Sequence, residues 1–175
     1  MNITPYHQND IDELYQLVVN SAKHLRPWMP WLHENYSRED TQSWVELCIN
    51  DWEQGHAFRY LVRSANGAIV GTVGLDQIDI AHKTGELGYW VGASKLNRGI
   101  ATQACLLAAK EAFESHKLMR IQINILTDNA PSNRVAIKLG ATFEGAQRNR
   151  LYHNGQSQNA NVYSLIPSDL LTQKL

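Results

Sequence analysis

The amino-acid sequence predicts an α+β fold with one mixed, mostly antiparallel sheet of about six to seven strands and helices on both of its faces. Three apolar runs of strand length follow one another in the first half of the chain, and segments with helical spacing of apolar residues precede and follow them. The dipeptide Asn-Gly occurs at 66–67 and at 154–155, each time between two strand-like runs, as expected for hairpin turns. No internal repeat, low-complexity stretch or linker interrupts this order, so we expect one domain over residues 1–175.

The N-terminal part predicts a short strand and two helices. Residues 2–6 fit the strand, and apolar residues at helical spacing follow over 11–25. A capping-box pattern at Ser37 and Asp40 begins the second helix, and Gly55 ends it. The apolar face that we expect on this helix consists of Trp44, Leu47, Cys48 and Trp52.

A loop with aromatic side chains separates these two helices. Pro27 and Pro30 prevent a continuous helix over residues 24–36, and Trp28 and Trp31 give the loop large apolar surfaces. These two tryptophans can pack in the core or line a groove that meets both substrate and water.

The middle of the chain predicts three antiparallel strands in series. Residues 58–62 and 69–75 form a hairpin, and polar residues 76–84 connect it to an aromatic strand at 86–91. We expect a bulge in this strand at Gly88, because glycine inside a strand is typical of a bulge.

The C-terminal part predicts two helices and three strands. A helix covers about 102–116, a strand 121–125 and a short helix 132–139. Strands at 142–152 and 159–166 then form the second hairpin.

Composition excludes several classes of function. A net charge of −1 and a pI near 6.6 provide no positive field for nucleic acid or an anionic membrane. No apolar run approaches the length of a membrane span, and residues 1–10 do not read as a secretory signal, so we expect a cytoplasmic protein. Cys48 and Cys105 are expected to be buried free thiols, and the histidines show no metal-ligand spacing, so we assign no metal.

The segment Leu96–Thr102 is the strongest candidate for chemistry. It reads Leu-Asn-Arg-Gly-Ile-Ala-Thr and joins the aromatic strand to the long helix. Amides at a helix start lack partners within the helix, so a turn there can hold a phosphate, and Gly99 lets the main chain approach closely. By itself the segment can equally be an ordinary strand-to-helix turn. Neither a dinucleotide-binding glycine motif nor a P-loop motif occurs in the chain.

The segments Leu96–Ala101 and Asn129–Gly140 together resemble the two signatures of the GCN5-related N-acetyltransferase (GNAT) superfamily. The first is similar to its pyrophosphate loop, although Leu96 stands where Gln or Arg is usual. In the second, Asn129, Ser132, Lys138 and Gly140 agree in spacing, and Ala141 replaces a common Phe. The loop after the first helix, the strand Glu86–Val91 and the segment Leu151–Gly155 resemble the Rim-type branch, which acetylates the N-termini of ribosomal proteins. The resemblance covers nearly the whole chain.

This resemblance implies a fold in which two splayed strands hold acetyl-CoA, and it implies the residues that bind the coenzyme. Backbone amides of Leu96, Asn97, Arg98, Gly99, Ile100, Ala101 and Thr102 would bind the diphosphate, with Arg98 as a phosphate contact and Asn129 and Ser132 close by. The backbone N–H of Trp90 or Val91 would stabilise the oxyanion of the reacting acetyl group.

Two catalytic roles follow from the resemblance. The tyrosine that many relatives use to protonate the thiolate is replaced by Ala136, so we expect Ser132 to be the acid, or else only the N-cap of its helix. Glu86 is the first candidate for the base, with His153 and Tyr152 as alternatives. Trp28 and Trp31 would line the acceptor groove.

The expected activity is transfer of an acetyl group to a primary amine by direct attack in a ternary complex, with a protein or peptide N-terminus as the favoured acceptor. A small amine such as a polyamine, aminoglycoside or amino acid is the alternative, as is a non-catalytic acyl-CoA-binding module. An adaptor that presents residues 28–32 to a protein partner would have no affinity for coenzyme A. The sequence leaves the oligomeric state open, with a homodimer as one option.

Overall fold

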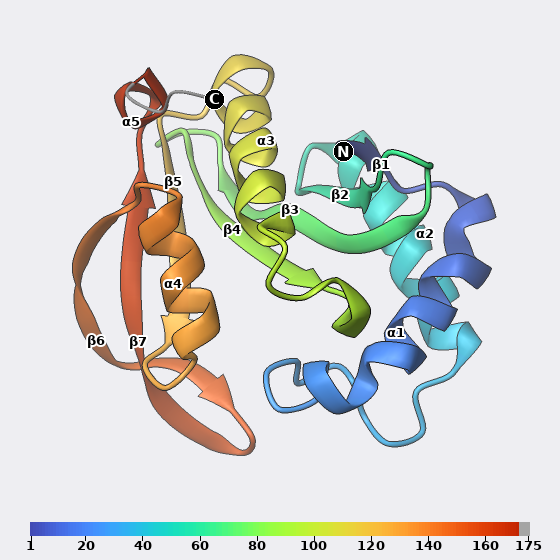
Figure 1. The fold of residues 1–175 in the computed structure, drawn as a ribbon. Coiled ribbons are helices and arrows are strands. Elements are labelled where there is room, and N and C mark those ends of the chain that lie inside the picture. The colour runs from blue at the N-terminus through green and yellow to red at the C-terminus, as the bar shows by residue number, and fades with distance from the viewer. Residues whose placement is uncertain (172–175) are drawn as a thin grey trace.

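The computed structural model describes residues 1–171, and within them a single mixed sheet of seven strands runs in the order β1-β2-β3-β4-β5-β7-β6 (Figure 1). The strands are β1 (Asn2–Pro5), β2 (Phe58–Arg63), β3 (Ile69–Asp79), β4 (Thr84–Val91), β5 (Arg120–Leu126), β6 (Thr142–His153) and β7 (Gln156–Leu165). The helices are α1 (Ile11–Leu25), α2 (Arg38–Gln54), α3 (Ile100–Glu114), α4 (Ala130–Lys138) and α5 (Pro167–Leu171), with short 3-10 turns at Gln8–Asp10 and Ala93–Lys95. Residues 172–175 of the expected domain lie outside the described residues.

The sheet has two antiparallel halves that meet at one parallel pair. Strands β1 to β4 are antiparallel neighbours in series, and β5, β7 and β6 form the other half. The parallel pair β4–β5 joins them through Thr84–Glu86 and Arg120–Gln122 only. The α+β class and the mixed sheet are therefore confirmed.

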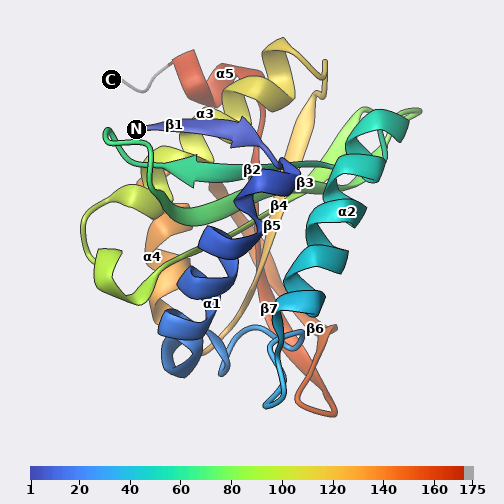
Figure 2. The same ribbon diagram turned by 90° about the vertical axis from the view of Figure 1, so that its right-hand side faces the viewer.

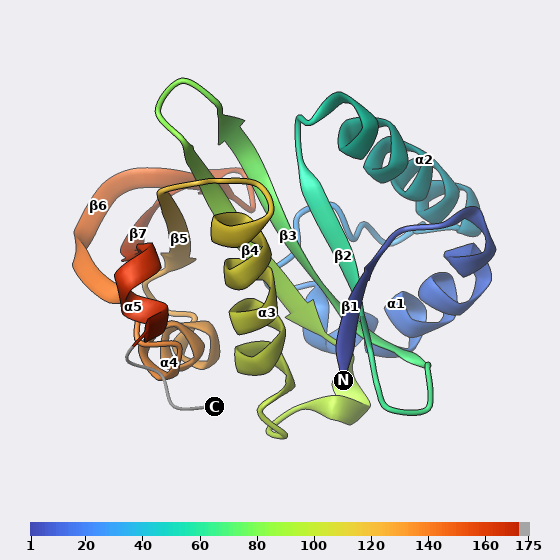
Figure 3. The same cartoon turned by 90° about the horizontal axis from the view of Figure 1, so that it is seen from above.

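Helices cover both faces of the sheet, as the sequence predicted. In Figure 3, α3 lies on one side of β1 and β2, and α1 and α2 lie on the other. Tyr60 and Val62 of β2 belong to the apolar cluster beneath α3, whereas Leu61 between them belongs to the cluster beneath α1 and α2. Successive side chains of a strand point to opposite faces of the sheet, so β2 contributes to both apolar clusters. Cys48 and Cys105 are free and buried, one in each cluster.

The predicted ends of α2 are confirmed. Ser37 and Asp40 form a capping box, and Gly55 closes the helix in the left-handed conformation, with φ of 69°. The predicted apolar face is wrong in part: Trp44 and Leu47 are 40% and 45% exposed. Among the four residues expected to form that face, Cys48 is the buried one, and Thr41 and Val45 share the buried side with it.

The expected bulge at Gly88 is also wrong. Residues 86–91 of β4 pair with 71–76 of β3 in continuous register, and the irregularity lies between Asp76 and Asp79 instead. Strand β3 extends to Asp79, into the segment predicted as a connection, and α3 begins at Ile100, two residues earlier than expected. The short helix α5 was not predicted.

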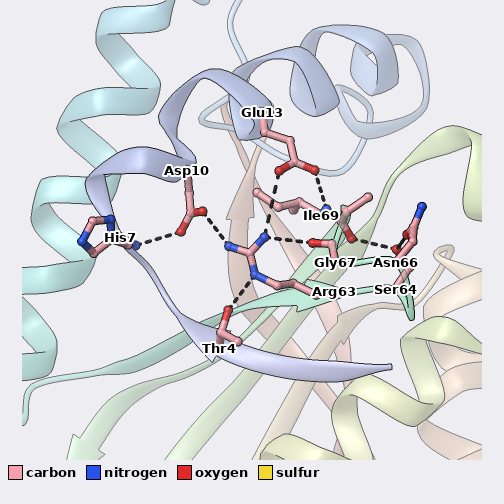
Figure 4. Close-up of polar contacts among 10 residues, drawn as sticks. Thr4, His7, Asp10, Glu13, Arg63, Ser64, Asn66, Gly67 and Ile69 are labelled. Carbon is pink, nitrogen blue, oxygen red and sulfur yellow. Dashed lines mark hydrogen bonds and ion pairs between the residues drawn. The ribbon is translucent and has the colours of Figure 1, made fainter.

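Arg63 joins the N-terminal segment to the sheet (Figure 4). Its guanidinium donates to Asp10 at 2.6 Å, to Thr4 at 3.1 Å and to the carbonyl of Gly67 at 3.1 Å. Glu13 accepts the N–H of Ile69 at 2.6 Å. These contacts hold α1 against the β2–β3 hairpin, and so fix one side of the site described below.

Candidate active site

The turn before α3 leaves the first amides of that helix without a side-chain cap. Asn97 and Gly99 both adopt left-handed conformations, with φ of 59° and 74°. Gly99 is the N-cap, its carbonyl accepts the first helical bond from Gln103 at 3.0 Å, and no described side chain caps the helix. Uncapped amides and the positive end of the helix dipole together favour an anion.

The rest of the predicted loop is accessible to a ligand. Leu96, Asn97 and Arg98 are exposed, and Ile100, Ala101 and Thr102 are half-buried. Within residues 1–171 the exposed guanidinium of Arg98 makes no hydrogen bond or ion pair, so it can turn toward an anion at this helix end.

A gap between β4 and β5 lies along the part of β4 that leads toward this turn. The two strands pair only as far as Glu86 and Gln122, whereas β5 pairs with β7 along its other edge from Ile121 to Leu126. In the described chain, Leu87–Val91 have no register partner on the β5 side. Figure 1 shows the two halves of the sheet diverging at this point. The splayed pair expected from the sequence is thus present, although no bulge at Gly88 produces it.

The N–H groups of β4 point alternately toward β3 and toward the gap, and this direction decides which of them can donate to a ligand in the gap. The N–H of Gly92 donates to the carbonyl of Val70, the residue that follows Ile69 in β3, at 2.9 Å. Because N–H groups alternate between the two sides of a strand, the N–H of Trp90 also points to β3, while those of Tyr89 and Val91 point into the gap. The geometry therefore favours Val91 over Trp90 as an oxyanion donor.

A cavity of about 650 Å³ opens on the gap from the side of α1 and α2. Its walls come from the α1–α2 loop, from α2, from the splayed parts of β4 and β5, from the start of α4 and from the β6–β7 hairpin. It brings together Trp28, Trp31, Trp90, Asn129 and Ser132, which are far apart in the sequence. Val91, Glu86 and the turn Leu96–Thr102 do not line it.

Ser132 presents a free hydroxyl at the start of α4. Asn129 is the N-cap of this helix, and its side chain accepts the N–H of Ser132 at 3.2 Å. The alternative that Ser132 serves as the cap is therefore wrong. Its hydroxyl has no partner among the described residues, while its carbonyl accepts a bond from the Tyr89 hydroxyl at 3.1 Å.

Tyr89 is a site residue that the sequence analysis missed. It lies in the quoted aromatic strand, lines the cavity and connects β4 to α4 across the gap. Burial raises the pKa of its hydroxyl far above the usual value, so Tyr89 stays neutral and acts as a hydrogen-bond donor.

Glu86 lies at the point where β4 and β5 part. Its carboxylate accepts a hydrogen bond from Asn124 at 2.7 Å, and a guanidinium nitrogen of Arg150 in β6 lies 3.9 Å away. Burial raises the pKa of Glu86 above its usual value, an effect that Asn124 and Arg150 partly oppose. The side chain is 24% exposed and makes no contact with the cavity, although Asn124 lines it. A water or a small movement must therefore link Glu86 to a ligand.

The aromatic loop forms the outer wall of the cavity. Trp31 contacts Trp90 and Tyr36, with ring centroids 6.3 and 5.7 Å apart, and Trp28 is half-buried beside it. The loop tryptophans are therefore wall residues of the cavity and are not fully buried.

The far end of the cavity carries a cluster of charges from α2, β2 and β3. The guanidinium of Arg59 pairs with Asp51 at 2.7 Å and with Asp76 at 2.6 Å, and it stands 4.8 Å from the ring centroid of Trp44. One guanidinium thus serves two carboxylates, so the cluster keeps one net negative charge. Nothing in the sequence spacing had indicated this cluster.

The two alternatives to Glu86 lie on the hairpin between β6 and β7. Tyr152 is 73% exposed, and its hydroxyl donates to the carbonyl of Gly155 at 3.0 Å. His153 is 5% exposed and its Nε2 donates to the carbonyl of Pro27 at 2.8 Å. Both line the cavity.

Over residues 1–171, no group of three or more His, Cys, Asp and Glu side chains is arranged to hold a metal ion. In the same residues, no helix has the length and apolar character of a membrane span.

Comparison with known proteins gives one consistent result. A family model described as "Acetyltransferase (GNAT) domain" matches residues 1–142. The ribosomal-protein-serine acetyltransferase of Escherichia coli K12 is 28% identical over 159 residues, which is 91% of this chain and 88% of that protein. The spermidine N(1)-acetyltransferase of the same organism is 26% identical over 166 residues, or 91% of this chain and 82% of the relative.

Solved structures give the same result. RimL, a ribosomal L7/L12 α-N-protein acetyltransferase in complex with coenzyme A, superposes with a TM-score of 0.87 at 26% identity, over 94% of this chain and 92% of that one.

Proposed function

The chain belongs to the GNAT acetyltransferase family, and from this premise we propose that it transfers the acetyl group of acetyl-CoA to the N-terminal amine of a protein or peptide, by direct attack in a ternary complex. The observation that carries the proposal is the uncapped, exposed start of α3 beside a splayed strand pair that opens onto a cavity. Such an arrangement lets a diphosphate, a thioester and an amine meet at one gap.

Coenzyme A fits the residues at the gap. The diphosphate would lie on the amides of Leu96–Thr102, where no described side chain competes for them, with Arg98 as its cation. Asn129 and Ser132 at the start of α4, with the edge of β4 at Trp90 and Val91, would enclose the pantetheine arm. RimL, bound to coenzyme A, supports this assignment.

Three groups of this chain would perform the chemistry. The N–H of Val91 points into the gap and would stabilise the oxyanion that forms on the acetyl carbonyl. The free hydroxyl of Ser132 would protonate the departing thiolate. Glu86, whose pKa is raised, would accept the proton of the attacking ammonium through a water. A free, cavity-facing hydroxyl at Ser132 argues against a module that binds acyl-CoA without catalysis.

The charges in the cavity favour a peptide over a polyamine as acceptor. A polycation needs several carboxylates without cation partners. Among the described residues that line the cavity, the carboxylates are Asp40 and Asp76, and Asp76 pairs with Arg59, which leaves Asp40. Glu34 and Glu39, two further acidic residues near Asp40, are exposed and do not line the cavity. The ribosomal-protein-serine acetyltransferase among the relatives supports the peptide, and the spermidine enzyme supports the small amine as second candidate.

We further propose that the protein works in the cytoplasm as one domain. Its bacterial relatives that modify ribosomal proteins support this location. A homodimer is an option that sedimentation of the purified protein would test.

Mass spectrometry after incubation with labelled acetyl-CoA tests the acceptor. The substrates are a hexapeptide with a free N-terminal serine, the same peptide with a blocked N-terminus and one internal lysine, and spermidine. We expect label on the serine α-amine. Faster labelling of spermidine would overturn the peptide assignment, and binding of coenzyme A without labelling of any amine would contradict the catalytic roles.

A further inference from the structure

His153 connects two segments that border the acceptor side of the cavity. It ends β6, at the hairpin with β7, and its Nε2 donates to the carbonyl of Pro27 at 2.8 Å in the loop that carries Trp28 and Trp31. Figures 1 and 2 both show this hairpin reaching the loop after α1. The imidazole thus lies where the hairpin and the aromatic loop meet.

The other ring nitrogen of His153, Nδ1, has no hydrogen-bond partner among the described residues. The side chain is nevertheless only 5% exposed. Within residues 1–171, every fully buried side-chain nitrogen or oxygen has a hydrogen-bond partner. Nδ1 therefore retains some accessible surface, and His153 is one of the residues that line the cavity.

The bond to Pro27 also fixes the chemistry of Nδ1. A carbonyl oxygen accepts only, so Nε2 must carry a proton, and in the neutral ring Nδ1 is then a bare acceptor. When a substrate fills the cavity and displaces water, an Nδ1 without a hydrogen-bond partner would weaken binding. A substrate that donates a hydrogen bond to Nδ1 therefore binds more tightly than one that does not.

We propose that Nδ1 of His153 accepts a hydrogen bond from an N–H of the acceptor, and so positions the peptide between the β6–β7 hairpin and the aromatic loop. This inference rests on the proposed peptide acceptor and adds the residue that recognises it. His153 is thereby a substrate-binding group, separate from the proton transfer assigned to Glu86.

Two substitutions separate this role from the contact with Pro27. In His153→Gln, the side-chain amide can still donate from about the place of Nε2, but no acceptor remains at Nδ1. We expect the KM for the serine peptide to rise about five- to tenfold, the loss of one hydrogen bond, while the KM for acetyl-CoA stays unchanged. His153→Phe removes both nitrogens and should add a loss of stability. His82→Gln is the matched control, because it makes the same change at a histidine whose side chain is 81% exposed and does not line the cavity.

Nitrogen NMR of the histidine ring gives a readout that a purely structural contact would not change. In protein labelled with 15N-histidine and saturated with coenzyme A, we expect His153 to show the Nε2–H tautomer. Addition of the serine peptide should shift the Nδ1 resonance and leave Nε2 nearly unchanged. An Nδ1 resonance whose chemical shift does not change when the peptide is added would overturn the inference.

The outcomes also distinguish this inference from the function it rests on. If the wild-type protein acetylates the peptide but His153→Gln keeps a normal KM, the inference is wrong and the proposed function stands. If the wild-type protein acetylates no peptide, the proposed function fails and the inference fails with it.

Discussion

Replacement of Gly99 by alanine separates the anion-binding role of the α3 turn from its structural role. Gly99 has φ of 74°, and a Cβ atom built there would meet nothing within 4 Å. The protein therefore has room for the methyl group. The same methyl would project from the exposed turn whose amides we assign to the diphosphate of coenzyme A.

Two different magnitudes follow. An alanine in the left-handed region costs about 1–2 kcal/mol of conformational energy, so Gly99→Ala should lower the free energy of unfolding by about that amount. Displacement of a diphosphate by even a small distance weakens one or two hydrogen bonds to a charged group, each worth roughly 1.5–3 kcal/mol. The Kd for coenzyme A should therefore rise by about ten- to hundredfold.

Gly67→Ala is the matched control. Gly67 has φ of 86°, also has nothing within 4 Å of a built Cβ, and lies in the β2–β3 turn. It should show a similar loss of stability in urea denaturation and an unchanged Kd for coenzyme A in isothermal titration calorimetry.

Two results would refute the reasoning. If Gly99→Ala binds coenzyme A as tightly as Gly67→Ala, the turn does not hold the diphosphate. If Gly99→Ala unfolds while Gly67→Ala does not, the turn has a structural role that its open surroundings do not indicate.

Three further predictions concern the gap and the helix beside it. Ser132→Ala should slow turnover about tenfold or more and leave the Kd for coenzyme A nearly unchanged; unchanged turnover would remove Ser132 from the acid role. Asn124→Ala removes a hydrogen bond that lowers the pKa of Glu86, so that pKa should rise and the acidic limb of the pH–rate profile should move to higher pH. An unmoved limb would exclude Glu86 as the base. Asn133→Ala should lower the free energy of unfolding by about 3 kcal/mol, because four hydrogen bonds to Leu126, Asn129, Asn161 and Tyr163 are lost in a buried site. In urea denaturation, a loss no greater than that of the exposed neighbour Arg134→Ala would contradict the role of Asn133 in holding α4.

Short-range patterns predicted most of the elements. The capping box at Ser37, the stop at Gly55 and the two Asn-Gly turns were readable because each depends on a few neighbouring residues. The positive φ of Gly99 follows from the same kind of local rule. The bulge at Gly88 failed because a glycine in a strand permits a bulge without requiring one, and the pairing with β3 remained regular.

The candidate site was predictable in part. Ser132 and the turn at Gly99 were found through sequence signatures. Tyr89, Asn124 and the cluster around Arg59 were not found, because each acquires its role from a partner far away in the chain: Ser132 for Tyr89, Glu86 for Asn124 and Asp76 for Arg59. The local sequence around a strand residue does not indicate which distant residue it will contact in the folded chain.

The sequence by itself thus determined the class of fold, the order of its elements and the turn that begins α3, since backbone preference and apolar periodicity are local properties. Only the tertiary structure decided where β4 and β5 separate, which amides of β4 face the gap, and that His153 meets the loop of Pro27. Those features depend on register between strands and on packing across the cavity, where residues more than a hundred positions apart come within hydrogen-bond distance.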